Sequence, residues 1–113
     1  MQYPYILVSL QEKTLTLVSS PTGIHHFPIA IGKNDTPTPQ GTWTILNKKI
    51  LADNGAFGSH WLGLNHPGYG IHGTNQPQLI GQAISGGCIR MYNQDVQFIF
   101  SKVAIGTPVI ISY

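Results

Sequence analysis

The chain has 113 residues, the size of one domain with a single core, and 42% of them are apolar, as a packed globule requires. Only 9% are charged and the net charge is +2, so no basic stripe can hold a phosphate backbone and we expect no nucleic-acid partner. No run approaches the roughly 18 apolar residues of a membrane span. The N-terminus lacks the basic segment of a signal peptide, so we expect no export signal.

The first part of the chain predicts strands. Leucine and β-branched residues alternate over residues 5–10 and 14–19, which indicates an opening hairpin. A third antiparallel strand is expected over 24–32, where Pro28 indicates an edge or a bulge. Two prolines and a glycine then predict a loop over 33–41. Further strands are predicted over 42–50, 61–65, 69–74 and 107–113.

One helix is predicted over residues 94–103, with Asn93 as its cap and apolar residues recurring at helical spacing. A short helical turn is expected after Asn75. The predicted fold class is mainly β: a sandwich or partly closed barrel of mixed sheets with one or two short helices. We expect a single domain over 1–113.

The segment "AISGGCIRM" (83–91) holds the only cysteine, Cys88, two residues before the only arginine, Arg90. Most lone cysteines are buried packing residues. Here, however, Gly86 and Gly87 would let a substrate approach the backbone, and the N–H groups of Gly87 and Cys88 could face a developing oxyanion. This arrangement favours a cysteine nucleophile for acyl transfer.

Five histidines compete for the role of base. His72 in "YGIHGTN" stands where a strand ends, which is typical of working side chains. The alternative is a zinc site, in which His60, His66 and His72, spaced six residues apart, would join Cys88. The spacing lacks the close ligand pair of a structural zinc site, so we expect no metal and no cofactor.

Four segments in order, "TPTPQGTWTI", "GSHWLGLN", "GYGIHGTN" and "SGGCIRM", resemble motifs of the L,D-transpeptidase catalytic domain, the YkuD-like family. The resemblance runs from roughly Tyr3 to Ile111. It implies a β-sandwich-like catalytic domain in which Cys88 attacks a peptidoglycan stem peptide, and in which His72 takes the thiol proton. The resemblance also implies that the carbonyl of Gly73 orients the His72 ring.

The sequence departs from this family at one motif position. Relatives usually carry a histidine directly before Gly-Cys, where this chain has Gly86. Because proton transfer needs one base near the sulfur, and His72 supplies it, we treat the change as variation in a supporting position.

The resemblance also suggests residues that contact substrate. Arg90 matches a family position and could hold a stem-peptide carboxylate in its bidentate fork, although an ion pair with Asp95 or Asp53 is the structural alternative. Tyr69, Trp61 and Ser85 are further candidates for the substrate groove. Strand aromatics are, however, more often core residues.

The resemblance implies an L,D-transpeptidase that transfers stem peptides from an acyl donor to an amine acceptor and that is acylated by carbapenem-type inhibitors. Two alternatives stay open: an L,D-carboxypeptidase that uses water at the same site, and a catalytically inactive wall-binding module. The implied location is the cell envelope or cell wall, or a spore.

Overall fold

The computed structural model describes residues 2–52 and 55–113. The helices within these ranges are the 3-10 helix η1 (Pro77–Leu79) and α1 (Asn93–Lys102). The strands are β1 (Tyr5–Ser9), β2 (Thr14–Val18), β3 (Ile24–Pro28), β4 (Ile31–Gly32), β5 (Gly41–Ile50), β6 (His60–Leu64), β7 (Gly70–His72), β8 (Ala83–Ser85), β9 (Ile89–Arg90) and β10 (Pro108–Ser112).

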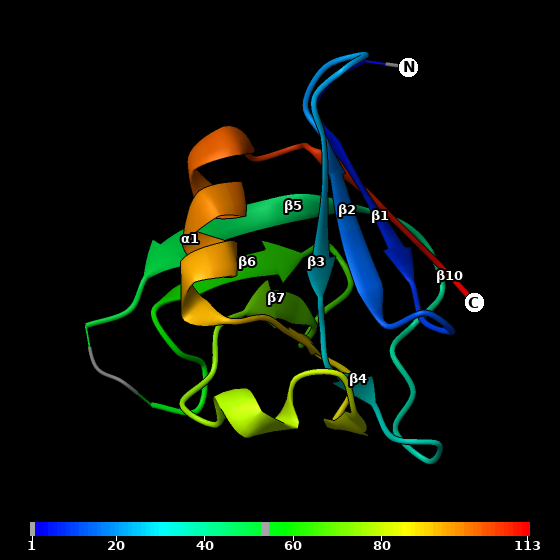
Figure 1. Cartoon of the computed structure of the whole chain (residues 1–113), viewed down its shortest axis with the longest axis vertical. Helices are drawn as coiled ribbons and strands as arrows, with labels where there is room; N and C mark the ends of the chain where they lie inside the picture. The colour runs from blue at the N-terminus through cyan, green and yellow to red at the C-terminus, as the bar shows by residue number, and fades with distance from the viewer. Residues whose placement is uncertain (1, 53–54) are drawn as a thin grey trace.

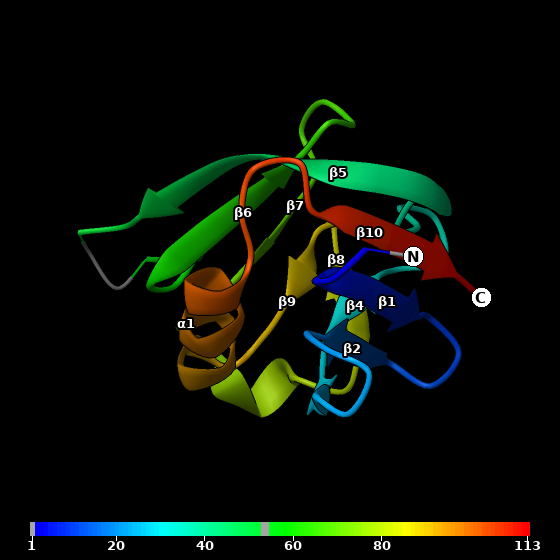
Figure 2. The same ribbon diagram turned by 90° about the horizontal axis from the view of Figure 1, so that it is seen from above.

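The described strands form one curled eight-stranded sheet, ordered β3-β2-β1-β10-β5-β6-β7-β9, and a two-stranded sheet of β4 and β8. The meander β1-β2-β3 is antiparallel, whereas β1 pairs with β10, and β7 with β9, in parallel. Figures 1 and 2 show the large sheet bending between the β1-β2-β3 end and the β5-β6-β7 end. The predicted fold class, mainly β with mixed sheets and short helices, is confirmed.

The core lies inside this curl. Alternate residues of the strands point inward because side chains on a strand change face at every residue. Helix α1 packs beside β6 and β7, and it closes the core with Val96 and Ile99, both 0% exposed. No helix in the described ranges has the length and apolar character needed to cross a bilayer. The fully buried strand residues include Ile6, Leu15, Leu17, Ile45, Leu62, Ile71 and Val109.

Two local expectations are corrected. The strand predicted over 24–32 divides into β3 and β4 after Pro28, and β3 is an edge strand, as the proline indicated. Asn93 does not cap α1: the cap is Tyr92, which makes no side-chain capping bond. The Asn93 side chain instead accepts hydrogen bonds from the loop that follows β7 and from the residue before β6.

Candidate active site

Three neighbouring strands place chemically active side chains in one row. Strand pairing sets Trp61 of β6 opposite His72 of β7, and His72 opposite Arg90 of β9. Ile71, next to His72, is fully buried in the core. His72 therefore lies on the other face of the sheet. Cys88 precedes β9 and stands two residues before Arg90, so the thiol reaches the same side.

These side chains line a cavity of about 300 Å³. Of the residues expected at the site, Cys88, His72, Arg90, Trp61 and Ser85 border the cavity. The full lining is Ala56, Phe57, Trp61, Gly68, His72, Ser85, Gly86, Cys88 and Arg90.

The imidazole of His72 is fixed in orientation and tautomer. Its Nδ1 lies 2.5 Å from the carbonyl oxygen of Gly73. A carbonyl only accepts hydrogen bonds, so Nδ1 carries the proton, and in the neutral ring Nε2 is left as the proton acceptor. Burial, with 2% of the residue exposed, lowers the pKa of His72 to about 4. The Gly73 bond partly opposes this shift and the charge of Arg90 adds to it.

Two aromatic rings enclose this imidazole. The Trp61 ring is stacked on it at 5.6 Å between centroids, and the Phe57 ring meets it edge-on at 4.9 Å. Phe57 was missed by the sequence analysis because it lies in a glycine-containing excursion with no alternating pattern. The two rings contribute to the burial that lowers the pKa of His72.

The Cys88 thiol is half-buried and lies against the backbone of the turn that precedes β7. Its Sγ donates to the carbonyl of Gly68 at 3.7 Å. Burial raises the pKa of Cys88, while a backbone hydrogen bond from Gly70 and the positive charge of Arg90 lower it. Both groups are therefore neutral near pH 7: a thiol and an unprotonated imidazole that border the same cavity.

Arg90 has an unused donor. Its Nε is buried and has no hydrogen-bond partner among the described residues. Burial raises the pKa of Asp95, which is opposite to the effect that a guanidinium partner would have. This argues against the ion pair with Asp95, and Asp53 lies outside the described residues.

The loop before Cys88 is held by the buried Ser85. Its hydroxyl donates to the carbonyl of Cys88 at 2.6 Å and accepts the N–H of Gly87 at 3.1 Å. The Gly87 N–H is therefore engaged, which corrects the expectation that it faces an oxyanion together with the Cys88 N–H. Although Ser85 borders the cavity, its hydroxyl is used within the loop.

Tyr69 was expected to line the substrate groove. It does not border the cavity, and its ring packs against Gly87. A Cβ at Gly87 would lie 2.3 Å from the Tyr69 ring, and the φ of Gly87 is +125°, a backbone conformation that side chains disfavour. At the adjacent Gly86, by contrast, a Cβ would meet nothing within 4 Å.

Asn93 is a site-supporting residue that the sequence did not reveal. Its Oδ1 accepts the N–H groups of Ser59 at 3.2 Å and Thr74 at 3.0 Å. The side chain thereby joins the start of β6 to the chain just beyond Gly73. An asparagine before a helical pattern indicates a cap, and nothing local shows that its side chain turns elsewhere.

The other histidines do not gather around Cys88. His60 is close to Ser59 and packs on Phe100, while His66 packs between Trp43 and Tyr69. Within residues 2–52 and 55–113, no three histidine, cysteine or acidic side chains lie together as a metal site would need. The zinc alternative therefore has no geometric support there.

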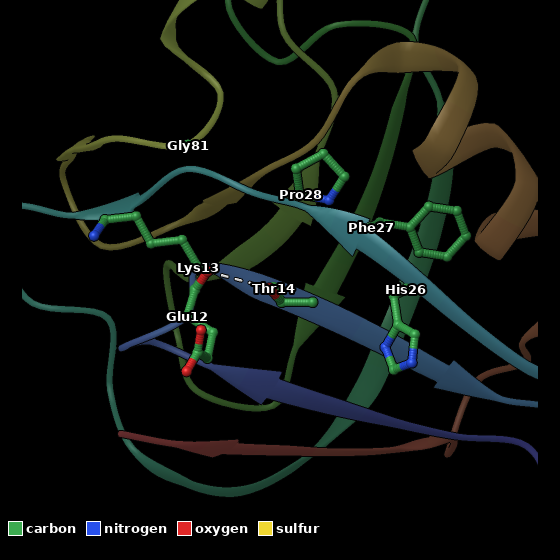
Figure 3. A pocket seen from close by; sticks show the side chains of 7 residues that line it. All are labelled: Glu12, Lys13, Thr14, His26, Phe27, Pro28 and Gly81. Carbon is green, nitrogen blue, oxygen red and sulfur yellow. Dashed lines mark hydrogen bonds between the residues drawn. The ribbon is translucent and has the colours of Figure 1, made fainter.

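A second, wider hollow lies at the β2–β3 edge (Figure 3). It combines the charged Glu12 and Lys13 with His26, but Figure 3 shows these side chains spreading apart rather than converging. It contains no nucleophile and no buried polar side chain. The Cys88 cavity is therefore the candidate site.

Solved structures define the class of fold. The chain matches the catalytic domain of the Enterococcus faecium L,D-transpeptidase with a TM-score of 0.81 and 25% identity, covering 99% of this chain and 98% of that one. It also matches L,D-transpeptidase 3 from Mycobacterium tuberculosis, in complex with a faropenem-derived adduct, with a TM-score of 0.79 and 21% identity over 97% of this chain and 61% of that one.

Sequence comparison then gives the family. The family model described as the L,D-transpeptidase catalytic domain, YkuD, matches residues 3–111. The YkuD protein of Bacillus subtilis (strain 168) is 48% identical over 110 residues, which cover 96% of this chain. The chain spans 66% of the length of that relative. The chain belongs to the YkuD family of L,D-transpeptidase catalytic domains.

Gly86 and Gly87 differ in the space around a Cβ atom, and this difference gives a stability prediction. We expect Gly87→Ala to lower the free energy of unfolding by about 2 kcal/mol or more, because the methyl group meets the Tyr69 ring and the backbone conformation is strained. Gly86→Ala, the matched control, should change it by less than about 0.5 kcal/mol. Urea unfolding measures both, and equal losses would contradict the packing described above.

Burial of neutral His72 predicts acid sensitivity. The folded-state pKa of about 4 lies below the ordinary 6.5, so the unfolded chain binds the proton first as the pH falls. Stability should therefore be lost between about pH 6.5 and pH 4, by on the order of 3 kcal/mol.

Urea unfolding at pH 7 and pH 4.5 measures this loss, with His72→Gln as the non-titrating control. The variant should lose clearly less stability than the wild type over the same interval. His60, whose pKa burial also lowers, contributes to the loss that remains. Identical losses in the two proteins would show that His72 is not buried in its neutral form.

Proposed function

We propose that this chain is a single catalytic domain that transfers peptidoglycan stem peptides through a thioester on Cys88, without metal or cofactor. The observation that carries the proposal is that the Cys88 thiol and the oriented imidazole of His72 border one cavity. Membership of the L,D-transpeptidase family supports the reaction class.

In the first half-reaction, Nε2 of His72 takes the thiol proton while the Cys88 sulfur attacks the carbonyl carbon of the donor peptide bond. The carbonyl oxygen becomes an oxyanion, and we assign its stabilisation to the Cys88 N–H. The C–N bond then breaks, the departing amine takes the proton from His72, and the acyl group remains on sulfur as a thioester.

In the second half-reaction, an acceptor amine attacks the thioester carbonyl and gives its proton to His72. The C–S bond breaks, the sulfur regains a proton from the imidazolium, and the new amide leaves. Water in place of the amine gives hydrolysis by the same residues. The balance between transfer and hydrolysis therefore depends on which nucleophile reaches the acyl-enzyme.

The pKa values favour transfer of the proton in step with attack. Because the resting thiol and imidazole are both neutral, the sulfur becomes nucleophilic only as His72 removes its proton. Consequently, the reactivity of Cys88 toward a small alkylating agent is a poor index of catalysis. Acylation by a substrate-like reagent is the better one.

Arg90 supplies a positive charge beside the reacting groups. Its buried, unpartnered Nε and its position opposite His72 support a role in binding a carboxylate of the stem peptide. Trp61 covers His72 and forms part of the wall that such a peptide would follow. With a peptidoglycan substrate, the proposed location is the cell envelope or cell wall, or a spore.

Acylation of Cys88 tests the nucleophile. After incubation with a carbapenem, intact-mass and peptide mass spectrometry should show one covalent adduct, located on Cys88. The imipenem complex of the L,D-transpeptidase LdtMt1 supports this choice of reagent, because imipenem is a carbapenem. His72→Gln should slow adduct formation by about 100-fold or more, because the base is lost.

Cys88→Ala is the control and should form no adduct and have no acyl-transfer activity. Turnover that survives in Cys88→Ala would refute the thioester mechanism. Absence of an adduct in the wild type, with no turnover of a stem tetrapeptide, would favour the inactive wall-binding module. Product analysis with and without an acceptor amine separates a transpeptidase from a carboxypeptidase.

Arg90 gives a test of substrate recognition. For a donor with a free carboxylate, we expect Arg90→Lys to raise KM about tenfold, because an ammonium keeps the charge but loses the bidentate fork. For the same donor with a carboxamide, the wild type and Arg90→Lys should differ by less than about twofold. Equal losses on both donors would contradict carboxylate binding.

A further inference from the structure

The ring of Tyr69 is in direct contact with the backbone that precedes the nucleophile. A Cβ at Gly87 would lie 2.3 Å from Tyr69 Cε1, and 3.1 Å from Cδ1. This contact leaves room only for glycine at position 87. Since Gly87 is bonded directly to Cys88, the position of the ring limits where the Cys88 backbone can lie.

Two further rings hold Tyr69 in place. His66 meets it edge-on at 4.6 Å between centroids, and Trp43 of β5 meets His66 at 4.8 Å. Trp43 is tied down by a hydrogen bond from Nε1 to the carbonyl of Pro39 at 3.2 Å. The buried Nδ1 of His66 has no partner among the described residues. Packing, and not hydrogen bonding of that nitrogen, is therefore the evident role of His66.

The turn that carries Tyr69 also contacts the Cys88 sulfur. Gly68, next to Tyr69, accepts the hydrogen bond of Cys88 Sγ, and Gly70 gives the backbone bond that lowers the pKa of Cys88. Ser85 holds the Gly87 N–H and the Cys88 carbonyl. The nucleophile is thus held between Ser85 and the turn that carries Tyr69.

We propose that Tyr69 is a positioning residue, which fixes Gly87 by contact and thereby directs the Cys88 thiol toward His72. The inference rests on the proposed function, and it replaces the earlier expectation that Tyr69 contacts substrate. Without the ring, glycine has a wide range of accessible backbone conformations. The loop would then lose the geometry that transfer of the thiol proton requires.

Two measurements on Tyr69→Ala and Tyr69→Phe test this role. In Tyr69→Ala, kcat for acyl transfer should fall about tenfold or more, with KM changed less than about twofold. Alkylation of Cys88 by iodoacetamide at pH 8 should become several-fold faster, because the released thiol is better solvated. Tyr69→Phe keeps the ring and should match the wild type within about twofold in both assays.

The controls separate positioning from general loss of stability. Tyr5→Ala, which removes a half-buried tyrosine outside the site, should leave both rates unchanged even if its Tm is lowered. A raised KM with unchanged kcat and alkylation in Tyr69→Ala would mean that the ring contacts substrate, and it would overturn the proposal. An unchanged kcat and KM would overturn it equally.

Alkylation keeps the two proposals distinguishable, because it does not depend on acyl transfer. If Cys88→Ala retained turnover, the proposed function would fail. The alkylation rates of the Tyr69 variants would still show whether the ring holds the thiol. An alkylation rate in Tyr69→Ala equal to that of the wild type would overturn the positioning role on its own.

Discussion

A buried imidazole whose Nδ1 donates to the Gly73 carbonyl has one nitrogen left with which to take a proton. Everything else at the site is arranged around that restriction. Trp61 and Phe57 pack against the imidazole and limit its contact with water. The pairing of β7 with β9 sets Arg90 opposite His72. No carboxylate is needed to orient the ring, because a backbone carbonyl does so. This is consistent with a chain that contains only four acidic residues.

Much of the fold could be predicted because strand patterns are local. The alternation over residues 5–10 and 14–19 predicts the opening hairpin, and it is found as β1 and β2. The parallel pairs β1–β10 and β7–β9 could not be predicted, since their partners are far apart in the chain and no turn sets their register. The very short β8 and β9 are also too brief to show a period.

The residues of the site, like the strands, could be predicted only in part. Cys88 and His72 were identified by short motifs, and the structure places them on one cavity. The supporting contacts depend on where side chains go after folding. Asn93 turns from its helix toward two backbone N–H groups, and Ser85 takes up the Gly87 N–H that sequence reasoning assigned to an oxyanion. The partners of Asn93 are 34 and 19 residues away, so no local pattern predicts them. Those of Ser85 are only two and three residues away, but the sequence does not show whether the Gly87 N–H binds this hydroxyl or stays free.

The half-buried, protonated state of Cys88 has a consequence for the lifetime of the protein. Peroxide attacks thiolates and not thiols, so susceptibility to oxidation follows thiolate character and exposure. In the proposed mechanism Cys88 loses its proton only during attack on the substrate, so the resting thiol is protected from conversion to sulfenic acid. The protonated resting state therefore makes the one cysteine of this chain slow to oxidise.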